Sequence, residues 1–241
     1  MKGGLSSTFP VDAVFVVCFS GYHKQRMHGL LQELERVGLK GKAQFVWTFP
    51  SPYEDWESSR LRGGLLLKKN KGMWGCTKGN YTAIKTAYEL GCQTVLIMED
   101  DVRFLKDLDF IRKAMLFTVR SWDILMLDHH HSSGGHGVGC VSNQYWVSRT
   151  KAYSTGAYIL NRRAMARLIQ LYEAPGISDA PGVRCFPSDH YLDKWKLTWG
   201  YKLHVARTPL AVQTPLVSSR STSRKLRKVF YKNTNFDKYA L

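Results

Sequence analysis

The sequence predicts a single α/β domain in which a mostly parallel sheet is flanked by helices. Continuous apolar runs at residues 11–19, 94–98 and 124–127 are typical of strands that are buried on both faces. Segments with apolar residues at helical spacing separate these runs, and such β-α-β alternation favours parallel strands connected by helices. The length of 241 residues and the 44% of hydrophobic side chains fit one globular domain with a full core.

The first half of the chain supplies two helices and a second, shorter strand. The helix after the first apolar run is expected to end at Gly38, because glycine is favoured just past helix C-termini. A short strand is expected at residues 43–48, followed by a charged, glycine-rich loop over residues 51–75. Thr77 is expected to cap the next helix, which runs to about Leu90.

The second half continues the alternation of strands and helices. A helix over residues 109–119 connects two of the apolar runs, and residues 153–160 are expected to form a strand. Residues 162–173 have the apolar spacing of a helix, and Ser188 is expected to cap another helix. Residues 202–206 are predicted to be the last strand of the domain.

Three consecutive carboxylates, Glu99, Asp100 and Asp101, follow the second central strand. Ligands of such sheets bind beyond the carboxyl ends of the strands, and adjacent carboxylates need a cation or basic side chains to offset their repulsion. On an extended backbone Glu99 and Asp101 share one side, where diphosphate oxygens and water would complete an oxygen shell for Mn²⁺ or Mg²⁺. Such a metal would neutralise a departing nucleotide diphosphate. An acidic surface loop or helix cap is the alternative interpretation.

Other stretches stand in order around the triplet. Residues 14–26 form a strand and a basic turn, residues 75–80 read Gly-Cys-Thr-Lys-Gly-Asn before an amphipathic helix, and residues 95–102 carry the triplet. Residues 155–160 and 187–192 supply a later strand and a helix start. In this order the segments resemble the family 25 glycosyltransferases, which include lipopolysaccharide and collagen galactosyltransferases. The resemblance implies a GT-A-like, Rossmann-type fold.

The resemblance also implies a function. It implies an inverting, metal-dependent glycosyltransferase that moves a hexose, galactose or glucose being favoured, from a UDP-sugar to a hydroxyl of a glycan, lipopolysaccharide or glycoprotein acceptor. Asp101 and Glu99 would then ligate the metal, and Glu99 or Asp100 would contact the ribose or a second metal position. Lipid-linked saccharides are further candidate acceptors. At residues 79–80 this chain has Gly-Asn where the family commonly has Ser-His.

Inverting transfer needs a general base to take the proton of the attacking hydroxyl. Asp189 is the candidate because it stands at the helix start that matches the family motif; helix capping together with Ser188 is the alternative. Nucleotide contacts are expected from residues around the first strand and from a later helix. These candidates are Phe19, Ser20, Lys24, Arg26 and Lys78, and solvated helix faces are the alternative for the three basic residues.

Residues 128–144 are rich in His, Gly and Ser and are predicted to be a loop over the same edge of the sheet. A lid that closes over bound donor is favoured, because excluding water protects the donor from hydrolysis. A zinc site is not expected, since histidines in a glycine-rich loop lack the rigidity of zinc ligands. Tyr145 and Trp146 are candidates for stacking on a sugar, with a hydrophobic hinge as the alternative.

The net charge of +16 predicts an anionic partner: nucleotide phosphates, an acidic glycan, a membrane surface or nucleic acid. Residues 1–217 are assigned to the catalytic domain. Residues 218–241 form a basic tail that either contacts anionic headgroups at a membrane surface or stays solvated. The alternative function is a metal-dependent nuclease or another nucleic-acid-binding protein, because two-metal nucleases also cluster carboxylates. The sequence contains no recognisable nucleic-acid-binding module, which argues against that alternative.

Cysteine usage and hydropathy bear on the location of the protein. Five cysteines, an odd number without a Cys-x-x-Cys pair, argue against a disulfide framework and favour a reducing compartment. The sequence shows no signal-peptide pattern and no apolar run long enough to cross a bilayer. The expected location is therefore the cytoplasm, with peripheral membrane contact through the basic tail as an option.

Overall fold

The computed structural model describes residues 10–19, 23–48, 71–116, 121–128, 143–148, 154–173 and 202–213, and the structural statements below concern these residues. The main sheet contains β1 (Ala13–Phe19), β2 (Ala43–Thr48), β3 (Thr94–Glu99), β5 (Ile124–Met126), β6 (Trp146–Ser148), β7 (Ala157–Asn161) and β8 (Leu203–Ala206). A separate pair contains β4 (Val102–Phe104) and β9 (Ala211–Gln213). The helices are α1 (His23–Arg36), α4 (Lys71–Glu89), α5 (Leu108–Leu116) and α6 (Arg162–Glu173).

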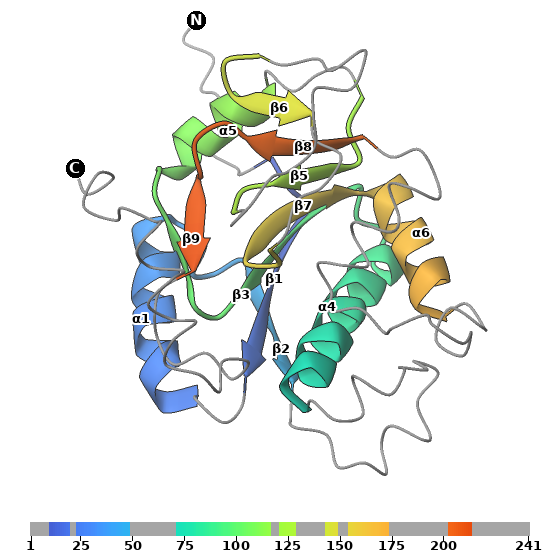
Figure 1. The fold of residues 1–241 in the computed structure, drawn as a ribbon. Helices are drawn as coiled ribbons and strands as arrows, with labels where there is room; N and C mark the ends of the chain where they lie inside the picture. The colour runs from blue at the N-terminus through green and yellow to red at the C-terminus, as the bar shows by residue number, and fades with distance from the viewer. Residues whose placement is uncertain are drawn as a thin grey trace, which may run out of the picture.

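The strands of the main sheet have the order β2-β1-β3-β7-β5-β8-β6 (Figure 1). β1 pairs in parallel with β2 and β3, and β5 pairs in parallel with β8. β7 runs antiparallel to β3 and β5, and β6 runs antiparallel to β8. The strands β1, β2, β3, β5 and β8 thus share one direction. This confirms the predicted mostly parallel α/β sheet, which the two reversed strands make a mixed one.

β7 is reversed because the chain enters it at the edge where β3 and β5 end. Ala157, the first residue of β7, pairs with Met98 near the end of β3. Its carbonyl oxygen accepts hydrogen bonds from the N–H groups of Leu127 and Asp128, which follow β5. The start of β7 therefore lies between the carboxyl ends of two strands, where ligands of α/β sheets bind.

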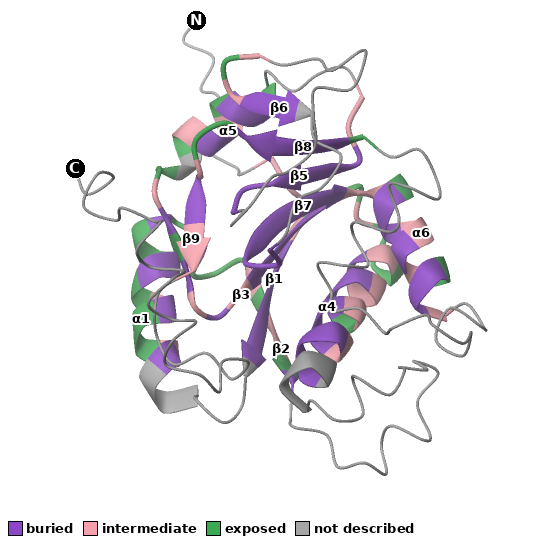
Figure 2. Ribbon diagram, in the orientation of Figure 1, coloured by how far each residue is buried: buried purple, intermediate pink, exposed green. Residues whose placement is uncertain are grey.

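Helices cover both faces of the sheet, and β1 shows this residue by residue. Phe15 and Val17 pack in a core cluster with residues of α4 and α6, whereas Val14 and Val16 pack in a second cluster with residues of α1 and α5. All four side chains are buried, and Figure 2 shows buried residues along the central strands. Burial on both faces explains why this strand appears in the sequence as a continuous apolar run.

Helix α4 begins earlier than the sequence predicts. It starts at Lys71, so Thr77 lies buried inside the helix, and the expected N-cap at Thr77 is wrong. Gly79 lets this helix approach the sheet: a Cβ atom there would stand 2.2 Å from Cγ2 of Thr48 and 2.5 Å from Cγ1 of Val17. Packing against β1 and β2 stabilises glycine-containing turns that helix propensity alone disfavours.

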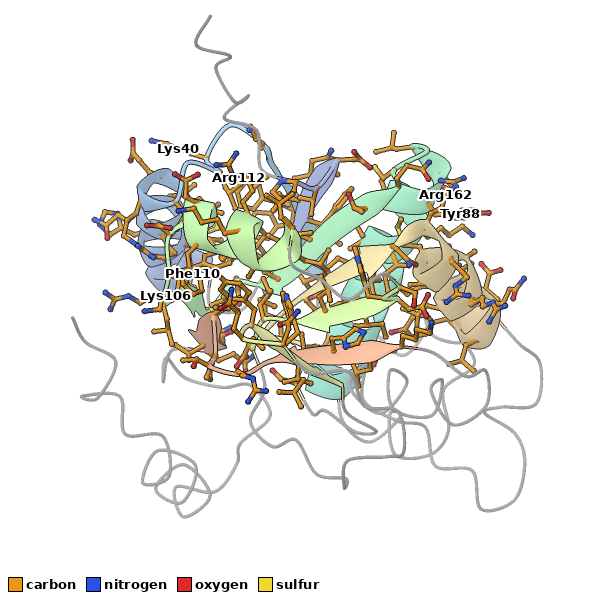
Figure 3. The ribbon with its side chains drawn as sticks, turned by 90° about the horizontal axis from the view of Figure 1, so that it is seen from above. Lys40, Tyr88, Lys106, Phe110, Arg112 and Arg162 are labelled. Carbon is orange, nitrogen blue, oxygen red and sulfur yellow. The ribbon has the colours of Figure 1, made fainter. Side chains whose placement is uncertain are left out.

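Several local predictions are confirmed. α1 ends before Gly38, whose φ of +72° is the left-handed conformation that favours glycine. β2 and α6 have the predicted bounds. Two aromatic contacts join α6 to α4: Arg162 lies 4.2 Å from the ring centroid of Tyr88 (Figure 3), and the rings of Tyr81 and Tyr172 meet edge to face.

β4, β6 and β9 are not predicted, because none of these short strands stands in an apolar run of four residues as β5 does. The β4–β9 ladder pairs Val102 with Gln213. It therefore returns the end of the described chain to the acidic triplet. The predicted helix after Ser188 and the tail over residues 218–241 lie outside the described residues.

Candidate active site at the carboxyl edge of the sheet

The acidic triplet lies where β3 ends. Glu99 is the last residue of β3, and Asp100 and Asp101 form the turn into β4. The N–H of Glu99 donates to the carbonyl oxygen of Gly156 at 2.8 Å, and the N–H of Asp100 donates to that of Val17 at 3.1 Å. The expectation of an extended backbone through the triplet is therefore wrong.

Glu99 and Asp101 nevertheless face one common point. Nε2 of Gln213 donates to Oε2 of Glu99 at 2.6 Å and to Oδ1 of Asp101 at 3.4 Å. The turn, rather than strand alternation, directs the two carboxylates to the same side. Gln213 is not predicted from the sequence, because no motif surrounds it and β9 alone brings it to the triplet.

Arg26 of α1 supplies positive charge beside the triplet. Its Nη1 lies 2.6 Å from Oδ1 of Asp100, and its Nη2 lies 3.5 Å from Oδ2 of Asp101. All three side chains are 10% exposed or less. Burial acts to lower the pKa of Arg26, but the charges of Asp101 and Asp100 outweigh it and raise the pKa. Arg26 is thus the basic partner that crowded carboxylates require.

The single charge of Arg26 does not balance three carboxylates. Burial, followed by the charge of Glu99, raises the pKa of Asp101 to about 8, although Arg26 opposes the shift. Asp101 therefore binds a proton more tightly than an ordinary aspartate does. A cation that bound between Glu99 and Asp101 would displace this proton and offset the repulsion.

The other oxygen of Glu99 is held from the opposite side. Oε1 accepts hydrogen bonds from Oγ1 of Thr155 at 2.5 Å and from Sγ of Cys76 at 3.3 Å. Asn80 donates to the carbonyl oxygen of Cys76 at 2.9 Å and accepts from the buried hydroxyl of Tyr158 at 2.5 Å. A chain of hydrogen bonds thus connects Glu99 to the core between α4 and β7, and it fixes the carboxylate plane.

These oxygens fit a hard divalent cation. Mg²⁺ and Mn²⁺ at nucleotide sites commonly take one or two carboxylates together with phosphate oxygens and water. Within the described ranges, no group of three or more His, Cys, Asp or Glu side chains comes together in an arrangement that could hold a metal. Glu99 and Asp101 would therefore supply two ligands, and phosphate oxygens of a bound diphosphate would complete the shell.

A groove of about 390 Å³ opens beside the turn, between α1 and β4. Glu33 of α1 fixes one wall, because its carboxylate accepts from the N–H of Phe104 at 2.6 Å and from Arg36 at 2.6 Å. The volume lies in the range of small-molecule sites. Charged side chains from α1, the turn and β4 line the groove: Arg26, Glu33, Arg36, Asp100, Asp101 and Arg103.

The remaining predicted nucleotide contacts are described only in part. Lys78 is a half-buried residue of α4, and Phe19 is the last residue of β1, which pairs with β3. Ser20 and Asp189, together with the side chains of Phe19 and Lys24, lie outside the described residues. So do residues 129–142, which include the histidines of the predicted lid.

The stacking role considered for Trp146 is wrong. Its side chain is fully buried, and its indole N–H donates to the carbonyl oxygen of Ala114 at 2.7 Å. Tyr145 packs edge to face on Phe110 at a centroid distance of 5.6 Å. Both aromatic residues thus connect residues 145–146 to α5.

A fourth carboxylate at this edge was missed. Asp128 follows β5 and is 2% exposed, and its Oδ2 accepts a hydrogen bond from Oγ of Ser154 at 2.9 Å. The signal for it is the one that marks the triplet: an acidic residue directly after an apolar run. From the sequence, Asp128 is instead expected at the start of the loop over residues 128–144.

Two predictions about the wider protein can be compared with the structure. Cys18, Cys76 and Cys92 form no disulfide among the residues described. In the same part of the chain, none of the helices has the length and apolar character needed to cross a membrane.

Comparisons with known proteins give matches only among solved structures, since no family model and no curated protein matches the chain. The chain is similar to mouse xyloside xylosyltransferase 1, with 8% identity and a TM-score of 0.45 over 80% of this chain and 84% of that one. It is also similar to a glycosyltransferase involved in glycosylation of the major capsid of PBCV-1, with 11% identity and a TM-score of 0.42 over 91% and 99%. A third match is the inositol-1-phosphate CTP transferase from T. maritima, with 13% identity and a TM-score of 0.38 over 91% and 76%. The matched structures thus include glycosyl and nucleotidyl transferases, and similarity at this level does not establish a shared activity or membership of family 25.

Proposed function

We propose that this protein is an inverting, metal-dependent glycosyltransferase that moves a hexose from a UDP-sugar to a hydroxyl of a glycan, lipopolysaccharide or glycoprotein acceptor. The observation that carries the proposal is the convergence of Glu99 and Asp101 on one point at the carboxyl edge of the sheet, beside buried Arg26. The ordered motifs that resemble family 25 support the same function.

The proposed roles follow from the contacts. Mn²⁺ or Mg²⁺, when bound, would supply charge neutralisation to the leaving diphosphate. Glu99 and Asp101 would hold the ion, and Arg26 keeps Asp101 oriented toward it. Thr155 holds Oε1 of Glu99 in place, whereas the amide of Gln213, whose Nε2 bridges Glu99 and Asp101, would turn away when an ion binds between them.

The proposed reaction is a single displacement. The acceptor oxygen forms a bond to the anomeric carbon while the bond from that carbon to the diphosphate oxygen breaks, and the diphosphate leaves with the bonding electrons. The proton of the acceptor hydroxyl passes to a general base. Asp189 is proposed for that role from the family resemblance alone. The configuration inverts because attack and departure occur on opposite faces of the sugar.

The net charge of +16 supports the anionic part of the proposal. It would attract the nucleotide sugar, an acidic glycan or an anionic membrane surface. We include peripheral membrane contact through residues 218–241, which sedimentation with anionic and neutral vesicles tests. Binding to both vesicle types, or to neither, would remove the tail from the proposal.

Thermal unfolding with nucleotides tests the proposed activity most directly. A ligand that binds only the folded state raises the unfolding midpoint. UDP and one UDP-sugar should therefore raise it with Mn²⁺ present and have little effect in EDTA. Asp101→Ala should abolish the Mn²⁺-dependent shift, whereas Asp109→Ala, which removes an exposed carboxylate of α5, should retain it.

Two outcomes would contradict the proposal in different ways. A full shift in Asp101→Ala would remove Asp101 from the metal site. The absence of any nucleotide effect, together with a salt-sensitive shift by oligonucleotides, would favour a nucleic-acid-binding protein. Degradation of plasmid in Mg²⁺ would then identify a nuclease.

A further inference from the structure

We propose that Asp128 is a positioning residue of the same site, and that it orients Glu99 through residues 154–156, the connecting segment. This inference rests on the proposed function, because it assigns Asp128 a role at the proposed metal and donor site. It adds a fourth strand-end carboxylate that neither the triplet nor the family resemblance includes.

The backbone places the connecting segment between the two carboxylates. Glu99 ends β3 and Asp128 follows β5, and these strands lie on either side of β7. The segment leads into β7, where the carbonyl oxygen of Gly156 accepts from the N–H of Glu99 at 2.8 Å and that of Ala157 accepts from the N–H of Asp128 at 3.2 Å. A displacement on the Asp128 side is therefore transmitted directly to the backbone beside Glu99.

Two successive side chains of the connecting segment donate hydrogen bonds to the two carboxylates, one to each. Oγ of Ser154 donates to Oδ2 of Asp128 at 2.9 Å and accepts from the N–H of Gly156 at 3.0 Å. Oγ1 of Thr155 donates to Oε1 of Glu99 at 2.5 Å. Because the Ser154 hydroxyl is held at both ends, it fixes the backbone from which Thr155 reaches Glu99.

Gly156 brings Asp128 close to the second support of Glu99 as well. A Cβ atom on Gly156 would stand 2.1 Å from Oδ2 of Asp128 and 3.0 Å from Cγ of Gln213. Gln213 in turn donates to Oε2 of Glu99 at 2.6 Å. Thr155, which holds one oxygen of Glu99, follows Ser154 in the chain, and Ser154 bonds to Asp128. Gln213, which holds the other oxygen, lies beside Gly156, and Gly156 lies close to Asp128.

Asp123, which directly precedes β5, is a useful comparison for Asp128, which follows the same strand. It is also buried, but Arg163 pairs with it through Nε at 2.8 Å and Nη2 at 2.6 Å. It also accepts from the N–H of Lys202 at 3.0 Å. Asp123 thus lies at the edge of the sheet opposite the triplet and serves as a matched buried carboxylate without access to Glu99.

Binding of UDP in the presence of Mn²⁺, measured by calorimetry, tests the positioning role. Asp128→Ala should weaken the affinity about 10- to 100-fold, as loss of residues that orient metal ligands does. Asp128→Asn should stay close to wild type, because its amide oxygen still accepts the hydrogen bond of Ser154. Asp123→Ala should lower the unfolding midpoint and leave the affinity unchanged. Equal losses in Asp128→Ala and Asp123→Ala, or wild-type affinity in Asp128→Ala, would overturn the inference.

Ser154→Ala provides a second variant on the same route. It should reproduce much of the affinity loss of Asp128→Ala. The double variant should bind UDP no more weakly than the single variant with the lower affinity, because both changes remove the same hydrogen bond between Asp128 and Ser154. Strictly additive losses would show that Asp128 acts on the site independently of Ser154, which contradicts the inference.

Crystal structures of the variants separate this inference from the proposed function. In Asp128→Ala, Oγ1 of Thr155 should move out of hydrogen-bond distance of Glu99, and in Asp123→Ala it should remain. If Thr155 stays on Glu99 in Asp128→Ala, the positioning role is wrong even where UDP binds. If Thr155 moves and the wild-type protein binds no nucleotide, the positioning role stands and the proposed function fails.

Discussion

The side chain of Asp101 is 10% exposed and lies beside two other carboxylates, and its raised pKa makes the stability of the metal-free protein depend on pH. Burial, the first cause, and the charge of Glu99 raise this pKa from 3.8 to about 8. The folded state therefore binds the proton more tightly than the unfolded state across this interval. The contribution of Asp101 to the free energy of unfolding falls as pH rises from about 4 to about 8.

Asp101→Asn should remove this dependence, because its side chain stays neutral. We expect a midpoint near that of wild type at about pH 4 and a higher one at about pH 8.5, by about 2–4 °C for each 1 kcal/mol gained. Thermal unfolding in EDTA across this range measures the difference. Asp109→Asn, at an exposed position, is the control and should follow wild type. Parallel curves for Asp101→Asn and wild type would contradict the assignment.

A further prediction at the scale of single residues concerns the stability of the Arg26→Ala variant. Arg26→Ala leaves Asp100 and Asp101 buried without its charge, and removing one partner of such a pair costs about 3–5 kcal/mol. Mn²⁺ should restore part of this loss, so its addition should raise the midpoint of the variant more than that of wild type. Lys40→Ala, which breaks an exposed pair with Glu35, should change the free energy of unfolding by about 1 kcal/mol or less. Equal denaturation midpoints in urea for Arg26→Ala and Lys40→Ala would contradict the structural role of Arg26.

At the scale of elements, replacing two helical glycines by alanine should change the free energy of unfolding in opposite directions. Gly79→Ala should destabilise the protein by about 1–3 kcal/mol, because the added methyl group meets Thr48 and Val17 and forces α4 away from the sheet. Gly29→Ala on α1 should stabilise the protein by about 0.5–1 kcal/mol. A Cβ atom at this position meets nothing within 4 Å outside the helix's own backbone, and alanine favours the helix. Urea unfolding of both variants decides whether packing or propensity governs α4. Stabilisation by both substitutions would contradict the close approach.

The elements that sequence analysis predicts well are those whose signals are local. In α6 the apolar residues of the buried face recur at helical spacing in the sequence. β1 is apolar throughout because helices cover both of its sides. The start of α4 is missed because the glycines at positions 72, 75 and 79 lower the local helix propensity of its first turns. The direction of β7 is missed for a different reason: it depends on the edge at which the chain re-enters the sheet.

At the scale of the whole molecule, the same distinction applies to the site. The triplet stands in a motif and Arg26 in the basic turn, so both are visible in the sequence. Gln213 is 114 residues from Glu99, and its contact exists only because β9 pairs with β4. The partnership of Asp128 with Glu99 likewise depends on β7 lying between two other strands. Long-range pairings of this kind leave no periodic signal.

The supports of Glu99 come from α4, the segment that leads into β7, and β9, so the site should be lost only when the domain unfolds. In urea, the loss of Mn²⁺-dependent UDP binding should coincide with the loss of helical circular dichroism, once ligand stabilisation is included. Binding followed by fluorescence and structure followed by circular dichroism, in the same samples, measure this. Binding that disappears well before the helical signal would show that the site melts locally.

The ladder between β4 and β9 also has a consequence during protein synthesis. Gln213 stands 112 residues after Asp101, so at about 5–20 residues per second the ribosome delivers it about 6–22 seconds later. Throughout this delay the nascent triplet lacks Gln213 as a partner, and its carboxylates remain accessible to water. A nascent chain therefore cannot assemble a complete donor site until the β9 segment has left the exit tunnel. Arrested chains that end before residue 211 should fail to retain UDP in the presence of Mn²⁺, however well their first strands have paired.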